Sequence, residues 1–248
     1  MLKSIVRRSN RHRHSPIDYH PEWLILGGNI ALLSAFVFDE PVARFFRSTH
    51  SELKSFGTVI TEVGNSGWIF AVAGVLLLQA LKHLRAADCR SIRYNASLIM
   101  QVASYVILTV AISGLTANLL KWLIGRTRPA LESTFTFAPF EGGHLYASFP
   151  SGHATTIGAI MMSLYLLAPV LRLPALILAL WLGFSRVMVG AHYPSDVIAG
   201  LALGAWFALL FASVFARYGL LFRKMERNFP RPRSGLRLTG GAGSIALK

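Results

Sequence analysis

The feature that most constrains this sequence is a run of 25 residues, Ala96–Leu120, that contains no charged side chain. About 20 consecutive apolar residues are enough to cross the hydrocarbon core of a bilayer as a helix. A second run, Val197–Ala216, is uncharged over 20 residues. Only 15% of all residues are charged, whereas soluble domains average about 25%. These observations predict an integral membrane protein and argue against one or two soluble domains.

Six apolar runs of this kind predict six transmembrane helices. Besides the two above, the runs are Trp23–Phe38, Val63–Leu81, His153–Leu171 and Leu173 to about Val189. The predicted fold class is therefore all-α, a polytopic membrane helical bundle over residues 22–216. Gly200 and Gly204 in the sixth run predict a close contact with another helix, because glycine lets two backbones approach.

Residues 39–62 separate the first two runs and mix apolar with charged side chains. Asp39-Glu40-Pro41 has the acidic residues and the proline that are typical of a first helical turn. Apolar residues then recur at roughly helical spacing. We expect a helix that lies in the membrane interface, where it either shapes a substrate entrance or serves packing alone.

The basic residues gather near the chain ends. Residues 1–21 form a predicted basic arm, and residues 217–248 form a basic tail that we expect to be disordered. Six spans place both ends on one side of the membrane, and that side receives 18 of the 25 Lys and Arg residues. The positive-inside rule makes this side the cytoplasm. No clear small-residue cleavage site follows the first run, so we expect that run to remain as an anchor.

The net charge of +14 raises the question of a nucleic-acid partner. The basic residues lie beside apolar runs, as the orientation signals of membrane proteins do, so no nucleic acid is expected. The single cysteine, Cys89, excludes an internal disulfide framework and a cysteine-based zinc site.

The outer ends of the spans carry ionisable residues, which are costly beside a membrane and therefore indicate function. Lys121 and Arg128 are seven residues apart, or two helical turns, so both side chains would point the same way. Two cations that face one point suit an anion with several oxygens, such as phosphate. Pro129 would end this helix. Alternatively, both side chains snorkel at the membrane edge.

The fourth span begins at Ser151-Gly152-His153. Serine is a common N-cap, and glycine lets the backbone approach a ligand closely. The free N–H groups at a helix start bind phosphate. The alternative is an ordinary cap beside an interfacial histidine.

The fifth and sixth spans are joined by Ser185–Asp196, which holds Arg186, His192 and Asp196 within twelve residues. A carboxylate beside an imidazole fixes its tautomer and stabilises the imidazolium. Alone, this pattern also fits a structural histidine–aspartate pair at a helix start. With the other two segments, the inventory becomes three cations, an anion-binding helix start, two histidines and one acid. Phosphoryl transfer requires such a set.

Three motifs in order carry a resemblance to a known family. They are Lys121-x6-Arg128-Pro129, Pro150-Ser151-Gly152-His153 and Ser185-Arg186-x5-His192-x3-Asp196. Together they resemble the signature of the type 2 phosphatidic acid phosphatase superfamily, which also includes vanadium haloperoxidases and glucose-6-phosphatase. The six spans resemble the bacterial membrane branch of that family more than its soluble haloperoxidases.

The resemblance implies a role for each motif residue. His192 would be the nucleophile and form a phosphohistidine, Asp196 would orient it, and His153 would protonate the leaving oxygen. The residues that would hold the phosphate oxygens are Lys121, Arg128, Ser151, Gly152 and Arg186. The family works without a metal, so no cofactor is expected. Arg126 lies outside the signature, and we consider it as an extra phosphate contact.

The lead interpretation is a lipid phosphatase whose site faces the periplasm from the bacterial inner membrane, with both termini in the cytoplasm. Its substrate would be a phospholipid, isoprenoid or glycolipid phosphate: phosphatidylglycerophosphate, phosphatidic acid, undecaprenyl diphosphate or lipid A. Residues 39–62 and 130–149 flank the site and are predicted to set specificity. Neither the substrate among these lipids nor the oligomeric state is specified by these motifs.

Three other interpretations fit parts of the sequence. A lipid alcohol could replace water as acceptor, which would make the protein a lipid-to-lipid phosphotransferase. His153, His192 and Asp196 could instead ligate a metal, although the surrounding cations would repel it. An anion channel or carrier is compatible with six spans but leaves the pairing of His192 with Asp196 without a purpose.

Overall fold

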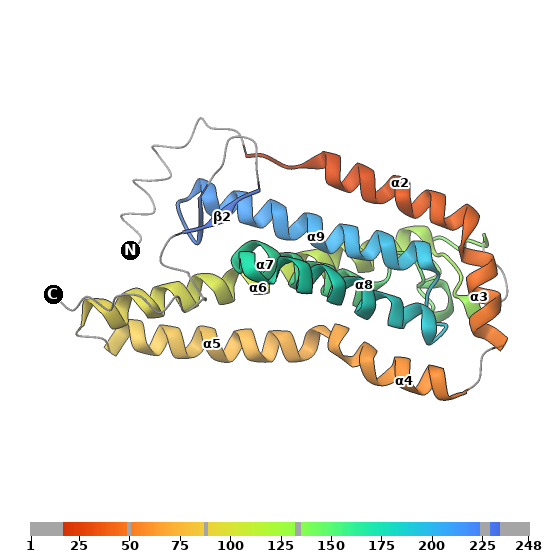
Figure 1. Ribbon diagram of the computed structural model, residues 1–248, viewed down its shortest axis with the longest axis horizontal. Coiled ribbons are helices and arrows are strands. Elements are labelled where there is room, and N and C mark those ends of the chain that lie inside the picture. Colours follow the sequence, from red (N-terminus) through yellow and green to blue (C-terminus); the bar gives the residue numbers. More distant parts are fainter. Residues whose placement is uncertain (1–16, 49–50, 87–88, 132–134, 224–228, 234–248) are drawn as a thin grey trace.

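The structure is a computed structural model that describes residues 17–48, 51–86, 89–131, 135–223 and 229–233. Its elements are α2 (Pro21–Val37), α3 (Asp39–Ser48), α4 (Ser51–Thr61), η1 (Glu62–Gly64), α5 (Ser66–Ala86), α6 (Arg90–Ile124), η2 (Pro129–Leu131), η3 (His144–Tyr146), α7 (Gly152–Leu167), η4 (Pro169–Leu171), α8 (Arg172–Met188), α9 (Pro194–Arg217), β1 (Phe222–Arg223) and β2 (Arg231–Pro232). Figure 1 shows the long helices lying side by side, with the two short strands at one end and the junction of α2 with α3 at the other.

Four helical stretches are long and apolar enough to cross a membrane: Lys54–Ala86, Arg90–Ile124, Pro169–Met188 and Pro194–Arg217. The bent pair α2 and α3 provides a fifth if it is counted as one span. The predicted fourth span is shorter than expected, because α7 has only 16 residues. Within the described residues the fold is thus a multi-pass helical membrane bundle with four or five spans by length and composition.

The predicted interfacial helix over residues 39–62 is in fact two helices. α3 begins at Asp39 and makes an angle of 60° with α2. It is amphipathic, because Ala43 and Phe46 are buried whereas Phe45 is exposed. α4 instead continues through η1 into α5, and the apolar stretch Lys54–Ala86 therefore extends the second predicted span toward its N-terminus.

α7 and α9 form the centre of the bundle and pack more extensively against each other than any other pair of elements. Their backbones approach closely at glycines of both helices. A Cβ at Gly200 would lie 2.5 Å from the carbonyl oxygen of Ser151, and one at Gly158 would lie 2.3 Å from that of Leu201. The predicted close contact at Gly200 and Gly204 is confirmed. It brings the N-terminal ends of the two helices together.

The tightest of these approaches gives a testable result. A Cβ at Gly204 would lie 2.0 Å from the carbonyl oxygen of Thr155, and two helix backbones cannot yield locally. We expect Gly204→Ala to lower the melting temperature in detergent by roughly 5–10 °C, because overpacking costs about 1–3 kcal/mol. Gly114→Ala is the matched control, since a Cβ there meets nothing within 4 Å. Equal melting temperatures for the two variants would show that α9 does not pack closely on α7 at Gly204.

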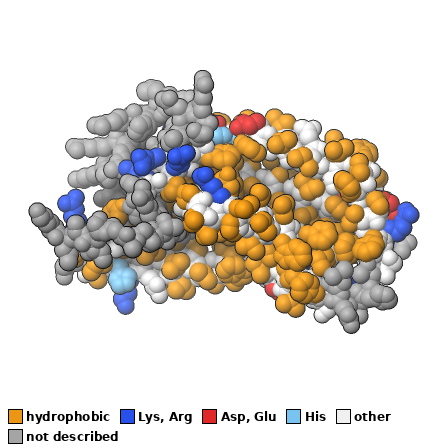
Figure 2. Space-filling view, viewed as in Figure 1, with side chains coloured by type: hydrophobic (Ala, Val, Ile, Leu, Met, Phe, Trp, Pro, Cys, Tyr) orange, Lys and Arg blue, Asp and Glu red, His pale blue; other side chains and the backbone are white. Residues whose placement is uncertain are grey.

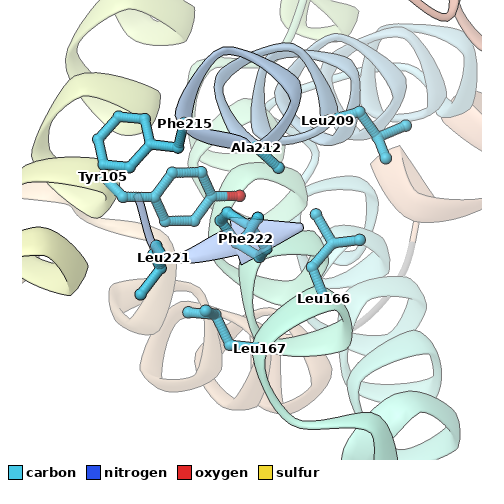
Figure 3. Close-up of a cluster of buried hydrophobic side chains, with 8 residues drawn as sticks. All are labelled: Tyr105, Leu166, Leu167, Leu209, Ala212, Phe215, Leu221 and Phe222. Atoms are coloured by element: carbon cyan, nitrogen blue, oxygen red, sulfur yellow. The ribbon is translucent and has the colours of Figure 1, made fainter. Parts of the chain in front are cut away.

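The opposite end of the bundle holds the largest apolar cluster, which Figure 3 shows in close-up. Tyr105 of α6 is fully buried there, and its hydroxyl donates to the carbonyl oxygen of Ala208 over 2.9 Å. Leu221 and Phe222 complete the cluster. This corrects the predicted disordered tail over residues 217–248, because its first part packs into the core and pairs as β1 with β2. The rest of that tail and most of the predicted basic arm lie outside the described residues.

The outer surface of the bundle is strongly apolar. On the face in Figure 2, hydrophobic side chains cover the broad right-hand part, whereas Lys and Arg gather on the left and at the right-hand edge. Large apolar side chains are exposed along the helices, such as Phe36, Leu78 and Leu173 at 63% or more of their surface. Such a surface is stable in lipid, which agrees with a multi-pass membrane protein.

Candidate active site

All eight predicted site residues lie at the end of the bundle where α2 meets α3. There α6 and α8 end and α7 and α9 begin. Lys121, Arg128 and Arg186 all act electrostatically on His153, and the first two also act on His192. The fold therefore brings the three sequence motifs to one place.

The first motif reaches the site by a route that differs from the prediction. α6 ends at Gly125, whose φ of 60° is left-handed, and not at Pro129. A Cβ at Gly125 would lie 1.9 Å from the carbonyl oxygen of Ala138, so the chain can turn there only with glycine. Arg128 therefore lies in the loop after the helix. Its nearness to Lys121 comes from this loop and not from two turns of one helix.

Two arginines of the site are partly buried, and each has a buried donor atom without a partner in the described part of the chain. The Nε atoms of Arg128 and Arg186 are inaccessible to solvent and have no hydrogen-bond partner among the described residues. Burial lowers the pKa of Arg128, and the Asp196 carboxylate opposes this shift. Arg186 Nη1 donates to Thr61 Oγ1 at the end of α4 over 2.7 Å. Guanidinium groups so placed suit phosphate oxygens, which accept charge-assisted hydrogen bonds.

The second motif forms the helix start that was predicted. Ser151 is the N-cap of α7, and its Oγ accepts from the backbone N–H of Ala154 over 3.4 Å. A Cβ at Gly152 would lie 3.5 Å from Lys121 Nζ, so the ammonium group lies over the first residue of α7. The first amides of a helix have no acceptor within it. They and the Lys121 ammonium group can bind the same anion.

His153 is held against the segment that follows α4. A Cβ at Gly64 would lie 3.2 Å from His153 Cβ and 3.3 Å from its Cδ2, so Gly64 allows η1 to pack directly on the imidazole. The histidine side chain keeps partial exposure. It is therefore positioned by packing yet remains accessible to a substrate.

The third motif places His192 beside Asp196. His192 is only 3% exposed, and its Nδ1 lies 3.7 Å from Asp196 Oδ2, a distance typical of an ion pair but too long for a hydrogen bond. Oδ2 also accepts from Ser148 Oγ over 2.5 Å and from the backbone N–H of Tyr193 over 3.0 Å. Because Nδ1 faces the carboxylate, Nε2 is the ring nitrogen that can face a substrate.

The environment of His192 keeps its imidazole neutral. Burial lowers its pKa from 6.5 to about 4; the Asp196 carboxylate opposes this shift, and the cations Arg128 and Lys121 add to it. At neutral pH the ring is therefore unprotonated at one nitrogen. A neutral imidazole with its N–H toward a carboxylate and its lone pair toward a bound phosphate is a nucleophile or a base.

The sequence suggested Arg126 as an additional phosphate contact. In the structure its guanidinium is instead occupied by two carboxylates. Its guanidinium is 4% exposed and bridges two carboxylates, with Nη1 2.7 Å from Asp196 Oδ1 and Nη2 2.8 Å from Asp39 Oδ2. It also lies over the ring of Tyr193, with Cζ 4.4 Å from the ring centroid. Arg126 thus supports the carboxylate behind His192.

Sequence reasoning missed several residues that contact the site. Asp39 and Thr61 come from the segment 39–62, and Ser148 comes from the segment 130–149. Both segments had been predicted to flank the site, and these contacts confirm their position. Asp39 could have been identified from the sequence, because it is an acid that directly follows an apolar run.

The donor groups do not form a metal site. Among the described residues no three His, Cys, Asp or Glu side chains lie close enough together to hold an ion. His153, His192 and Asp196 therefore do not form the ligand set considered from the sequence, and Asp196 is engaged by Arg126, Ser148 and Tyr193 instead.

Comparisons with known proteins agree on the family to which this chain is similar. A sequence profile described as the PAP2 superfamily matches residues 102–219. Lipid A 1-phosphatase of Rhizobium johnstonii is 43% identical over 227 residues, which cover 89% of this chain and 92% of that protein. Lipid A 1-phosphatase of Rhizobium etli is 42% identical over 205 residues, or 82% and 88% of the two chains.

More distant relatives share part of the chain or the fold. Undecaprenyl-diphosphatase BcrC of Bacillus subtilis is 35% identical over 114 residues, which cover 45% of this chain and 55% of that protein. The crystal structure of a transmembrane PAP2-type phosphatidylglycerolphosphate phosphatase from Bacillus subtilis matches with a TM-score of 0.53 at 22% identity. That match covers 78% of this chain and 94% of the other, and it shows a shared fold.

Proposed function

The chain belongs to the PAP2 superfamily and is a membrane lipid phosphatase, and from this premise we propose that it removes the 1-phosphate of lipid A. The two Rhizobium relatives that cover most of this chain are lipid A 1-phosphatases. Relatives that act on isoprenoid diphosphates match less than half of it. Among the lipids considered from the sequence, lipid A therefore has the strongest support.

Apolar hollows beside the site support a lipid substrate. A groove of about 520 Å³ between α8 and α9 is lined by Trp181, Phe184 and Pro194, among others. A second hollow of about 390 Å³ lies between α2 and the loop after α6, and Phe135 and Phe137 contribute to it. Acyl chains held in such grooves would keep the phosphate at the membrane surface, within reach of His192.

The proposed reaction has two steps. His192 Nε2 attacks phosphorus, the bond from phosphorus to the lipid oxygen breaks, and His153 donates a proton to that oxygen. Water then attacks the phosphohistidine, His153 accepts its proton, and phosphate leaves while His192 regains its lone pair. Nδ1 facing Asp196 Oδ2 at 3.7 Å is the observation that carries this mechanism, because it directs the other nitrogen at substrate.

Cationic and dipolar groups would stabilise the transition state. Lys121, Arg128 and Arg186, with Ser151 and Gly152 at the start of α7, would bind the phosphate oxygens. The buried Nε atoms of both arginines support this assignment, since a phosphate would supply their acceptors. No step of this mechanism requires a metal.

We also propose the orientation in the membrane. With α2–α3 and the shorter α7 counted as passes, the chain crosses six times, and both termini lie in the cytoplasm. The site end would then face the periplasm from the bacterial inner membrane. The count of 18 of the 25 basic residues in segments assigned to the opposite side supports this orientation.

A substrate panel tests the proposal. Purified protein in detergent is given lipid A, undecaprenyl diphosphate, phosphatidylglycerophosphate and phosphatidic acid, and we expect kcat/KM for lipid A to exceed the others by at least about tenfold, or ~1.4 kcal/mol. Mass spectrometry identifies which phosphate is lost. Faster release from another lipid would replace the proposed substrate. Phosphate recovered on a lipid acceptor and not in solution would indicate a phosphotransferase.

A further inference from the structure

We propose that Asp39, which lies outside all three motifs, is a positioning residue that prevents Arg126 from neutralising the Asp196 carboxylate beside His192. This inference rests on the proposed phosphohistidine mechanism. It concerns a chain of buried polar groups that links the start of α3 with the start of α9.

Asp39 is fully buried at the bend between α2 and α3, and both its oxygens are used. Oδ1 accepts from the backbone N–H of Ser195 over 2.9 Å, and Oδ2 accepts from Arg126 Nη2 over 2.8 Å and from Ser195 Oγ. The Ser195 amide lies in the first turn of α9, where amides have no acceptor within the helix. Asp39 therefore caps α9 from another helix.

Arg126 connects this carboxylate to the reacting groups. Its Nη1 donates to Asp196 Oδ1 over 2.7 Å and to Ser195 Oγ over 2.7 Å. One guanidinium thus lies between two buried carboxylates, Asp39 on one side and Asp196 on the other. Only the second of these faces His192.

The charge balance explains why two carboxylates are needed. One arginine charge divided between two acids leaves net negative charge on the pair, which can stabilise the imidazolium-like charge that develops on His192 during attack. Without the charge of Asp39, Arg126 would pair with Asp196 alone and neutralise it. The remaining pair would be less able to stabilise charge on His192, and attack would slow.

A purely structural role explains this arrangement less well. A buried ion pair contributes little net stability, because the desolvation of both charges offsets their attraction. The position of α3 does not depend on Asp39 alone either, since Arg47 Nη1 also donates to the carbonyl oxygen of Pro129 over 3.0 Å. The extra acid at Asp39 is therefore better explained by its effect on Asp196.

Asp39→Asn tests the inference, because it keeps the shape and removes the charge. We expect kcat for lipid A to fall about 10- to 100-fold while KM changes less than about threefold. Glu40→Gln is the matched control, since this neighbouring acid pairs with Arg44 and Arg47 on its own helix, and its kcat should equal that of wild type. Turnover is counted per mole of protein in the monodisperse fraction eluted in detergent, so a misfolded fraction does not contribute.

A double-mutant cycle separates positioning from simple stability. In an Asp196→Asn background, Asp39→Asn should lower kcat less than about twofold further, because no carboxylate charge remains to be preserved. If Asp39→Asn does not fold, Arg126→Lys replaces it in the test. Lysine keeps the positive charge but cannot bridge both carboxylates as the planar guanidinium does. This variant should likewise lower kcat with KM unchanged. Wild-type kcat for Asp39→Asn, or the same loss in both backgrounds, overturns the inference.

The controls separate this inference from the proposed function. If wild type and Glu40→Gln release no phosphate from any lipid, the proposed function fails. If both release phosphate and Asp39→Asn equals them, only the role of Asp39 fails.

Discussion

Replacing His192 by asparagine should abolish phosphate release, with kcat at least about 10⁴-fold below that of wild type. The asparagine amide can occupy the place of Nδ1 beside Asp196, which lies 3.7 Å from the imidazole in the intact site. It supplies no second nitrogen with a lone pair, so no bond to phosphorus can form. The smaller polar side chain should leave the fold intact.

Three measurements make this result decisive. Rapid acid-free quenching with labelled substrate should yield a phosphoenzyme in wild type and none in His192→Asn. Melting temperature and elution volume in detergent should match those of wild type, which excludes unfolding as the cause. His83→Asn, an exposed histidine in the last turn of α5, serves as the control and should retain full activity. Turnover above a few per cent in His192→Asn would refute the nucleophile assignment.

Replacing His153 by alanine should lower kcat for lipid A by about 10²- to 10⁴-fold, the usual contribution of a general acid. The imidazole packs against Gly64, and three cations act on it, so it lies where phosphate oxygens would be held. Without it, the lipid oxygen must leave as an anion. The loss should be smaller for a substrate whose leaving group is already a stable anion.

An aryl phosphate therefore distinguishes proton donation from other roles of His153. For a nitrophenyl phosphate, His153→Ala should lose at least about tenfold less activity than it loses for lipid A, because a nitrophenolate needs no proton to leave. Equal losses on both substrates would assign His153 to binding or to structure. His83→Asn again serves as the control for both substrates.

Sequence reasoning could locate the candidate site because ionisable residues stand out in an apolar chain. The Ser151 cap and the pairing of His192 with Asp196 both depend on residues close in sequence, so local spacing suffices to predict them. The sequence predicts that Lys121 and Arg128 lie close together because they are two helical turns apart. They do lie close together, but the loop after α6 brings Arg128 back to Lys121. Gly125 is the helix stop, and a glycine near the end of an apolar run is a known signal of it.

What the sequence could not reveal depends on contacts between distant segments. Asp39 and Ser195 are 156 residues apart, and Ser148 and Asp196 are 48 apart, so no periodicity relates them. The role of Arg126 follows from these contacts and could not be separated from that of Arg128 by spacing alone. The length of α7 was also overestimated, because an apolar helix surrounded by protein need not match the bilayer thickness.

The C-terminal segment shows how composition can mislead. Its many basic residues predicted disorder, yet Leu221 and Phe222 are almost fully buried against Tyr105. The short apolar run Leu220-Leu221-Phe222 within this basic segment was the available signal. Burial of two large side chains stabilises such a segment by roughly 3–6 kcal/mol, which outweighs its local preference for solvent.

The hydrogen bonds from Asp39 to Ser195 have a consequence for biogenesis. They join the first helical bend to the last long helix, and the acid behind His192 belongs to that last helix as well. A nascent chain that has inserted everything up to α8 already holds the cations and His153. It still lacks Ser195, which binds Asp39, and Asp196, which faces His192. On the proposed mechanism, catalytic competence would arise in one step, when α9 enters the membrane, and partly synthesised chains would be inert toward the lipids around them.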